Sequence, residues 1–182
     1  YERAIERAQQ DFDLKKIDQP TSGILPHHLI AAHADAAVFL ALAKDPPKRI
    51  VLISPNHFSQ GKENIQTTSQ EFDTPFGIVK SDRSVVKELF TEGVVSVEPK
   101  SFDREHGITG LVPFIAKLLP DTKIVPILVA VGTPTTTLES LALSLSKIDD
   151  DTVFLASVDF SHYLPVAVAA FHDARSFAVL AA

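Results

Sequence analysis

The sequence predicts an α/β fold, in which a sheet of largely buried strands packs between helices. Three observations support this. Short apolar runs alternate with helix-like segments, these runs stay apolar on both alternating faces, and 182 residues suit one domain with its own core. A composition of 45% hydrophobic and 22% charged residues excludes global disorder. We therefore expect residues 1–182 to form a single domain, with residues 1–22 as a helical or extended lead-in.

Four apolar runs carry the prediction of the central sheet. They are rich in β-branched residues and are bounded by turn residues, as is typical of strands buried on both faces. The predicted strands are Gly23–Leu25, Ile50–Ser54, Lys123–Val129 and Thr152–Ser157. The first ends at Pro26, which cannot donate to a strand ladder and so belongs at a strand end.

Helix-like segments separate these strands. We predict helices over residues 31–43, 82–91, 107–119, 136–146 and from 167 to the end. The polar residues 61–80, with Thr74-Pro-Phe-Gly77 in their middle, predict a long loop or hairpin. Residues 171–182 have the pattern of a helix with no capping glycine or proline after it, and the sequence contains no methionine. We therefore expect the domain to be incomplete at its C-terminus.

Charge and composition exclude several classes of function. Lysine and arginine number 17 against 23 acids, and no basic block could follow a phosphate backbone, so nucleic acid is not an expected partner. No apolar run approaches a membrane span and no signal-peptide core is present, so we expect a cytoplasmic protein by default. Without cysteine, any metal must be held by histidine and carboxylate. Nucleotide-binding and serine-hydrolase motifs are absent, so we expect no nucleotide cofactor.

Histidine-bearing loops directly follow three of the predicted strands. These loops are Pro26-His27-His28, Pro55-Asn56-His57 and Asp159-Phe-Ser-His162. Ligands of open α/β sheets bind outside the carboxyl ends of the strands, so we expect the loops to converge there. Imidazole binds metals and transfers protons near neutral pH, so the cluster predicts a metal or acid–base site. Elsewhere, His33 is expected to be structural and His172 to face solvent.

Several candidates keep more than one interpretation. His28 fits a metal ligand, a residue that supports a ligand, or an ordinary loop residue. Glu105 fits a helix cap or a hydrogen-bond partner of a ligand histidine. Asp159 either points into one pocket with His162 or caps the following turn.

Six motifs, in order along residues 23–171, resemble the Memo family, whose bacterial members are also called AmmeMemoRadiSam system protein B. The motifs are PHHL (26–29), ISPNHF (53–58), DTPFG (73–77), EHGITGLVPFI (105–115), IVPILV (124–129) and SVDFSHY (157–163). The resemblance implies a fold similar to the catalytic subunit of class III extradiol ring-cleavage dioxygenases. That fold has a mixed central β-sheet with helices on both faces and a site for a non-haem metal.

The same resemblance implies a metal site. His27 and His57 match the family's histidine elements and would bind iron or copper. The third family ligand, a cysteine or an acid, comes from a C-terminal segment that this sequence does not contain. The family's Pro-His-Ala-Gly is replaced here by Pro26-His27-His28-Leu29, which adds an imidazole beside the site.

The resemblance also implies catalytic groups and partners. His162 and Asp159 would form an acid–base or hydrogen-bonding pair, and His106 would lie near the same pocket. Residues expected to support the ligands are His28, Glu105 and Asn56. The family name suggests radical SAM and AMMECR1-like proteins as partners.

Three functions fit these residues. The first is a metal-dependent oxidoreductase with dioxygenase-like chemistry on an unknown small substrate. The alternative is a binding protein that keeps the fold and pocket and recognises a peptide or small molecule without turnover. The third is hydrolysis by a metal-bound water, with His162 as base.

Overall fold

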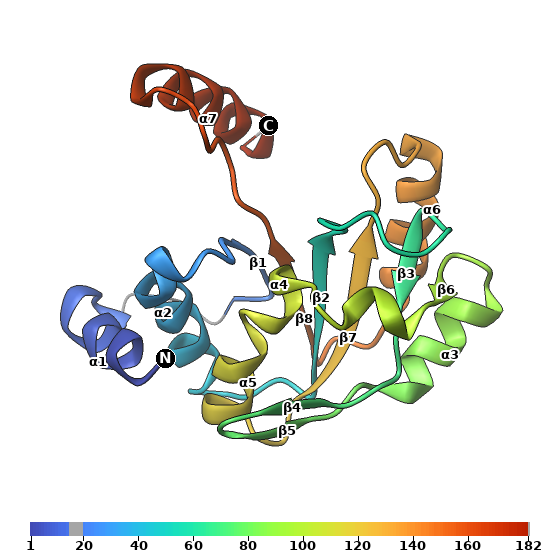
Figure 1. Cartoon of the computed structure of the whole chain (residues 1–182). Helices are drawn as coiled ribbons and strands as arrows, with labels where there is room; N and C mark the ends of the chain where they lie inside the picture. Colours follow the sequence, from blue (N-terminus) through green and yellow to red (C-terminus); the bar gives the residue numbers. More distant parts are fainter. Residues whose placement is uncertain (15–19, 182) are drawn as a thin grey trace.

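The structure is a computed structural model that describes residues 1–14 and 20–181 (Figure 1). Its strands are β1 (Ser22–Leu25), β2 (Arg49–Pro55), β3 (Ile65–Thr67), β4 (Phe72–Thr74), β5 (Gly77–Val79), β6 (Ser96–Val97), β7 (Lys123–Val129) and β8 (Thr152–Ser157). Its helices are α1 (Glu2–Asp11), α2 (Ala32–Leu42), α3 (Arg83–Thr91), α4 (His106–Thr109), α5 (Val112–Leu118), α6 (Thr135–Leu145) and α7 (Val166–Leu180), with short 3-10 helices η2 (Leu29–Ala31) and η3 (Pro99–Phe102). The predicted α/β fold is confirmed.

The main sheet has six strands in the order β1-β8-β2-β7-β3-β6, and β4 and β5 form a separate hairpin. Strands β1, β8, β2 and β7 are mutually parallel, whereas β3 runs antiparallel to β7. The sheet is therefore mixed, as predicted. The carboxyl ends of the neighbouring strands β1, β8 and β2 lie side by side, and we call this end of the sheet the carboxyl edge.

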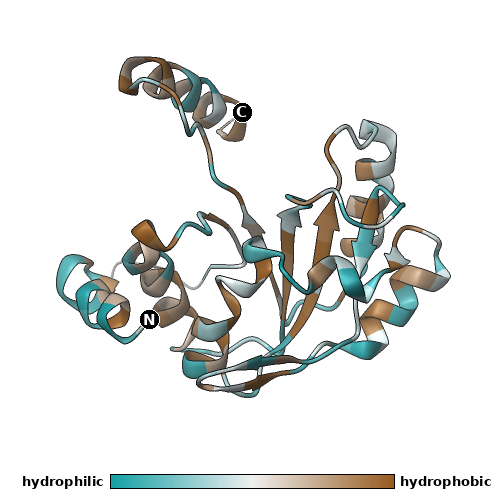
Figure 2. Cartoon of the chain, in the orientation of Figure 1, coloured by the Kyte–Doolittle hydropathy of each residue, from teal (hydrophilic) through white to brown (hydrophobic). Residues whose placement is uncertain are grey.

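Helices cover both faces of the sheet, and β2 shows how the sequence supports this. Its Ile50 and Leu52 pack in one apolar cluster with residues of α2 and α5, whereas Val51 packs in a second cluster with α3 and α6. Rings from α2 and α5, Phe39 and Phe114, stack with centroids 5.6 Å apart. Apolar residues gather in the central strands (Figure 2). Burial on both faces explains the continuous apolar runs in the strand sequences.

The two ends of the chain differ in their packing. Helix α1 lies against α2 and buries Ile5 and Ala8, whereas residues 15–19 of the predicted lead-in lie outside the described residues. Helix α7 projects away from the sheet after β8 (Figure 1), and Phe171, Phe177 and Leu180 are each more than half exposed. Within the described ranges, no helix has the length and apolarity needed to cross a membrane.

Two local predictions were incomplete. Residues 61–80 do contain a hairpin, β4-β5, but they also contain β3, which joins the main sheet at β7. Strand β3 has only three residues, with the polar Gln66 at its centre, so its sequence is too short to show the two-residue repeat of a strand. Only its pairing with β7 reveals it. The helix predicted over 107–119 is broken between α4 and α5. Pro113 lies in the first turn of α5, where its missing N–H favours a new helix start.

Candidate metal centre

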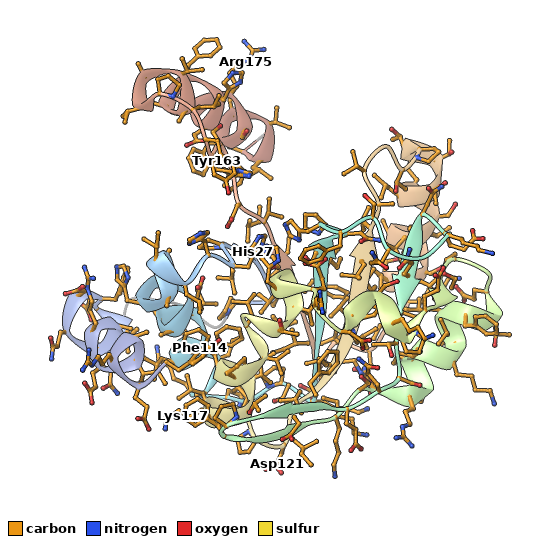
Figure 3. All side chains as sticks on the ribbon, in the orientation of Figure 1. His27, Phe114, Lys117, Asp121, Tyr163 and Arg175 are labelled. Carbon is orange, nitrogen blue, oxygen red and sulfur yellow. The ribbon has the colours of Figure 1, made fainter. Side chains whose placement is uncertain are left out.

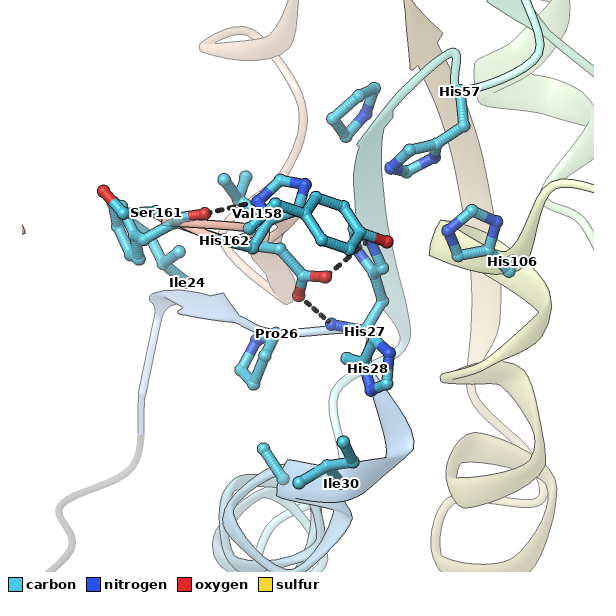
Figure 4. Close-up of a pocket in the computed structure, with 15 residues that line it drawn as sticks. Ile24, Pro26, His27, His28, Ile30, His57, His106, Val158, Ser161 and His162 are labelled. Atoms are coloured by element: carbon cyan, nitrogen blue, oxygen red, sulfur yellow. Dashed lines mark hydrogen bonds and ion pairs between the residues drawn. The ribbon is translucent and has the colours of Figure 1, made fainter. Parts of the chain in front are cut away.

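The histidine loops meet at the carboxyl edge of the sheet. His27 follows β1, His57 follows β2 and Asp159 follows β8, so the parallel order of these strands brings the three residues together. His106 begins α4, which lies against β2. Figure 3 places His27 at this edge and Asp121 at the opposite end of the molecule, and Figure 4 shows the histidines around one pocket.

Three imidazoles lie close enough to share one ion. The ring centroids of His27 and His57 are 4.7 Å apart, those of His27 and His106 are 5.1 Å apart, and those of His57 and His106 are 4.2 Å apart. Each ring offers a nitrogen, and these nitrogens all lie within 4.8 Å of one another. The cluster can therefore hold a metal ion. His106, which the family resemblance placed near the same pocket, is the third member of this cluster.

Glu105 holds the His57 loop in place. Its fully buried carboxylate accepts hydrogen bonds from the His57 backbone amide at 2.9 Å and from the Gly107 amide at 3.0 Å, and it lies 2.6 Å from His57 Nδ1. The same side chain thus caps α4 and contacts a histidine of the cluster. Glu105 thus acts as a helix cap, one of the interpretations left open by the sequence, and also contacts His57.

A buried serine contacts His27. Ser157, the last residue of β8, lies with its Oγ 3.0 Å from His27 Nδ1 and donates a hydrogen bond to the Gly107 carbonyl at 2.5 Å. No role for Ser157 was predicted from the sequence. The signal available was a polar residue at the end of an apolar strand, directly before a histidine loop.

Asp159 lies on the other side of the His27 ring. One carboxylate oxygen accepts a hydrogen bond from the His27 backbone amide at 3.2 Å, and the other lies 3.4 Å from His27 Nε2. Burial lowers the pKa of His27 below its ordinary value of 6.5; Asp159 opposes this effect, and His57 and His106 add to it. The neutral imidazole that binds metals is therefore favoured near neutral pH.

A pocket of about 990 Å³ opens beside the cluster. His162 and Asp159 both line it, together with the three clustered histidines. His162 is exposed, and its Nδ1 lies 2.8 Å from the Phe160 carbonyl, outside the cluster. Much of the remaining wall is apolar: Ile24, Pro26, Ile30, Ala31, Pro55, Val158, Phe160 and Tyr163.

The other candidates lie around this site or away from it. His28 lines the pocket but is not part of the cluster. Asn56 is buried, and its side chain exchanges hydrogen bonds with the backbone of Gln60, which closes the loop after β2. His33 is half-buried in α2, and His172 is exposed on α7.

Fold and site together define an α/β protein with a histidine centre at the carboxyl edge of a mixed sheet. The Memo-like protein family model matches residues 1–176. A MEMO1 family protein of Saccharolobus solfataricus is 32% identical over 169 residues, covering 86% of this chain and 58% of the relative. One from Caldivirga maquilingensis is 34% identical over 151 residues, covering 80% and 52%. The chain belongs to the Memo family, and it spans little more than half the length of these curated relatives.

Proposed function

We propose that the chain binds one transition metal ion, iron or copper, through His27, His57 and His106, and that this centre serves an oxidoreductase reaction on a small substrate. The observation that carries the proposal is the convergence of three imidazoles from three separate elements within 4.8 Å. Dioxygenase-like chemistry is the form of the reaction that the family resemblance suggests.

The donor set fits such an ion. Imidazole nitrogens suit iron, copper, zinc and nickel, whereas calcium and magnesium prefer oxygen. His27 is buried, while the His57 and His106 side chains are 27% and 52% exposed, and all three line the pocket, so an ion held by them would be accessible from it. A bound iron or copper ion supplies Lewis-acid and redox chemistry at that border.

The residues beside the cluster supply binding and proton transfer. Apolar side chains such as Ile24, Ile30 and Phe160 hold the body of a substrate and exclude water from the pocket. His162 donates its Nδ1 proton to the Phe160 carbonyl, which leaves Nε2 to accept a proton from a substrate. Asp159 holds the backbone amide of His27 and lines the same pocket.

The metal proposal is tested by measuring metal content. The purified chain is loaded separately with ferrous, cupric and zinc ions, desalted, and measured for metal per chain. We expect the protein to retain one ion, and His57→Ala to lose it. His172→Ala is the matched control, because His172 lies exposed on α7. Retention of the ion by His57→Ala, or no retention by the unmodified chain, would contradict the proposal.

Oxygen consumption separates the oxidoreductase from a binding protein that keeps the same pocket. The metal-loaded chain is mixed with a catechol as probe in an oxygen electrode. We expect uptake above that of metal-free protein, and none with His57→Ala. Binding of the probe with no oxygen uptake would favour the non-catalytic binding protein.

A further inference from the structure

We propose that Glu105 and Ser157 are positioning residues that fix the proton of His57 and of His27 on Nδ1, so that Nε2 of both rings keeps the lone pair a metal ion needs. The inference rests on the proposed metal site. It concerns the tautomers of the two rings, which the hydrogen-bond partners of each ring decide.

The tautomer of His27 follows from the partners of Ser157. A serine hydroxyl has one proton, and Ser157 donates it to the Gly107 carbonyl at 2.5 Å, since a carbonyl oxygen can only accept. The Oγ atom must then accept from His27 Nδ1, 3.0 Å away. Ser157 is fully buried, so water does not compete for this bond. The carboxylate of Asp159 lies 3.4 Å from Nε2, beyond the usual hydrogen-bond length, and accepts from the His27 backbone amide instead. The lone pair of His27 is therefore on Nε2.

The tautomer of His57 follows from the chemistry of Glu105. Each carboxylate oxygen accepts from a backbone N–H group, one from His57 and the other from Gly107. With both oxygens acting as acceptors, Glu105 accepts from His57 Nδ1, 2.6 Å away, and the imidazole is the donor. The lone pair of His57 is also on Nε2.

Gly107 joins the two arrangements. Its amide donates to Glu105 and its carbonyl accepts from Ser157, so both histidine partners are anchored at the start of the same helix, α4. A Cβ atom at this position would lie 1.9 Å from Ser54 Oγ, which explains why the close approach of α4 to β2 requires glycine.

His106 has a different environment. Its Nδ1 lies 3.8 Å from the nearest Glu105 oxygen, which is too long for a hydrogen bond. Its side chain is also the most exposed of the three. The structure thus assigns two preorganised ligands, His27 and His57, and one adaptable ligand, His106.

The test measures tautomers directly in the metal-free protein. Long-range proton–nitrogen NMR of 15N-histidine-labelled protein at about pH 8, above the ordinary imidazole pKa of about 6.5, reports which ring nitrogen carries the proton. We expect Nδ1–H for His27 and His57. In Glu105→Gln the new amide group can donate to His57 Nδ1, so the His57 proton should move to Nε2. Metal affinity should then fall about 10–100-fold.

Two further variants make the test specific. Glu98→Gln is the matched control, because Glu98 also accepts backbone amide hydrogen bonds, from Lys62 and Glu63, away from the site. It should change neither tautomer nor affinity. Ser157→Ala removes the acceptor for His27 Nδ1 and should give a mixture of His27 tautomers. It provides an independent arm if Glu105→Gln does not fold.

The outcomes separate this inference from the proposed function. A proton on Nε2 of either ring in the unmodified protein overturns the inference, as does an unchanged His57 tautomer in folded Glu105→Gln. Nδ1–H tautomers in a protein that retains no metal would uphold the positioning role and overturn the proposed metal site.

Discussion

Asp35 is a buried acid to which the described part of the chain offers no hydrogen-bond partner. It lies in the first turn of α2 with 0% exposure, and neither of its carboxylate oxygens has a hydrogen-bond partner among the described residues. Burial raises the pKa of Asp35 from 3.8 to about 7, and the negative charge of Asp159 adds to the effect. Its ionised form is therefore strongly disfavoured in the folded protein.

Replacing Asp35 by asparagine removes this ionisation at nearly constant shape. The folded-state pKa lies above the unfolded value, so protonation favours the folded state, and this contribution is lost as the pH rises through about 7. The difference between 3.8 and about 7 corresponds to at most about 4 kcal/mol. Below the unfolded value of 3.8 the Asp35→Asn variant should match the unmodified protein in stability. By about pH 8 it should be more stable by up to that amount.

Urea unfolding at several pH values measures the effect. The quantity to follow is the difference in unfolding free energy between Asp35→Asn and the unmodified protein, both metal-free, because contributions from the histidines then cancel. Asp121→Asn serves as control, since Asp121 lies exposed in a turn. A difference that does not change with pH, or an Asp35→Asn protein less stable than the unmodified one at about pH 8, would contradict the raised pKa of Asp35.

Three further substitutions test other parts of the structure. Gly107→Ala should lower the unfolding free energy by about 1–3 kcal/mol, because its Cβ would overlap Ser54; an unchanged melting temperature would contradict this. Arg49→Met should lower the free energy of unfolding in urea by about 3–5 kcal/mol, because it removes the ion-pair partner of the buried Asp82 carboxylate, which lies 3.0 Å from Arg49 Nε. A loss below about 1 kcal/mol would count against a buried ion pair. His162→Ala should leave metal content unchanged while abolishing any oxygen uptake, and loss of the ion would make His162 a ligand.

The sequence predicted the central strands closely, for a physical reason. Lys123–Val129 and Thr152–Ser157 have the same bounds in the prediction and in the structure, because strands buried on both faces leave a continuous apolar run. The short strands β3 and β6 have two or three residues and polar members, so only their sheet neighbours define them. Periodicity is informative only where an element is long enough to repeat it.

The part of the site that could be predicted is the part that depends on the order and direction of the strands. Strand ends meet at one edge of a parallel sheet, so loops that follow strands converge, and this places His27 beside His57. The position of His106 depends on where α4 packs against β2, which no local pattern encodes. Ser157 and Asp35 were missed because their roles arise from contacts across the fold, although Asp35 is the lone acid in an apolar helix.

Anomalous X-ray diffraction from crystals soaked with a copper or ferrous salt locates directly any ion held by the three histidines. We expect one anomalous peak per chain, about 2 Å from a ring nitrogen of each of His27, His57 and His106. A peak elsewhere on the chain, a peak bound by only one of these rings, or no peak at the cluster would contradict the proposed metal site.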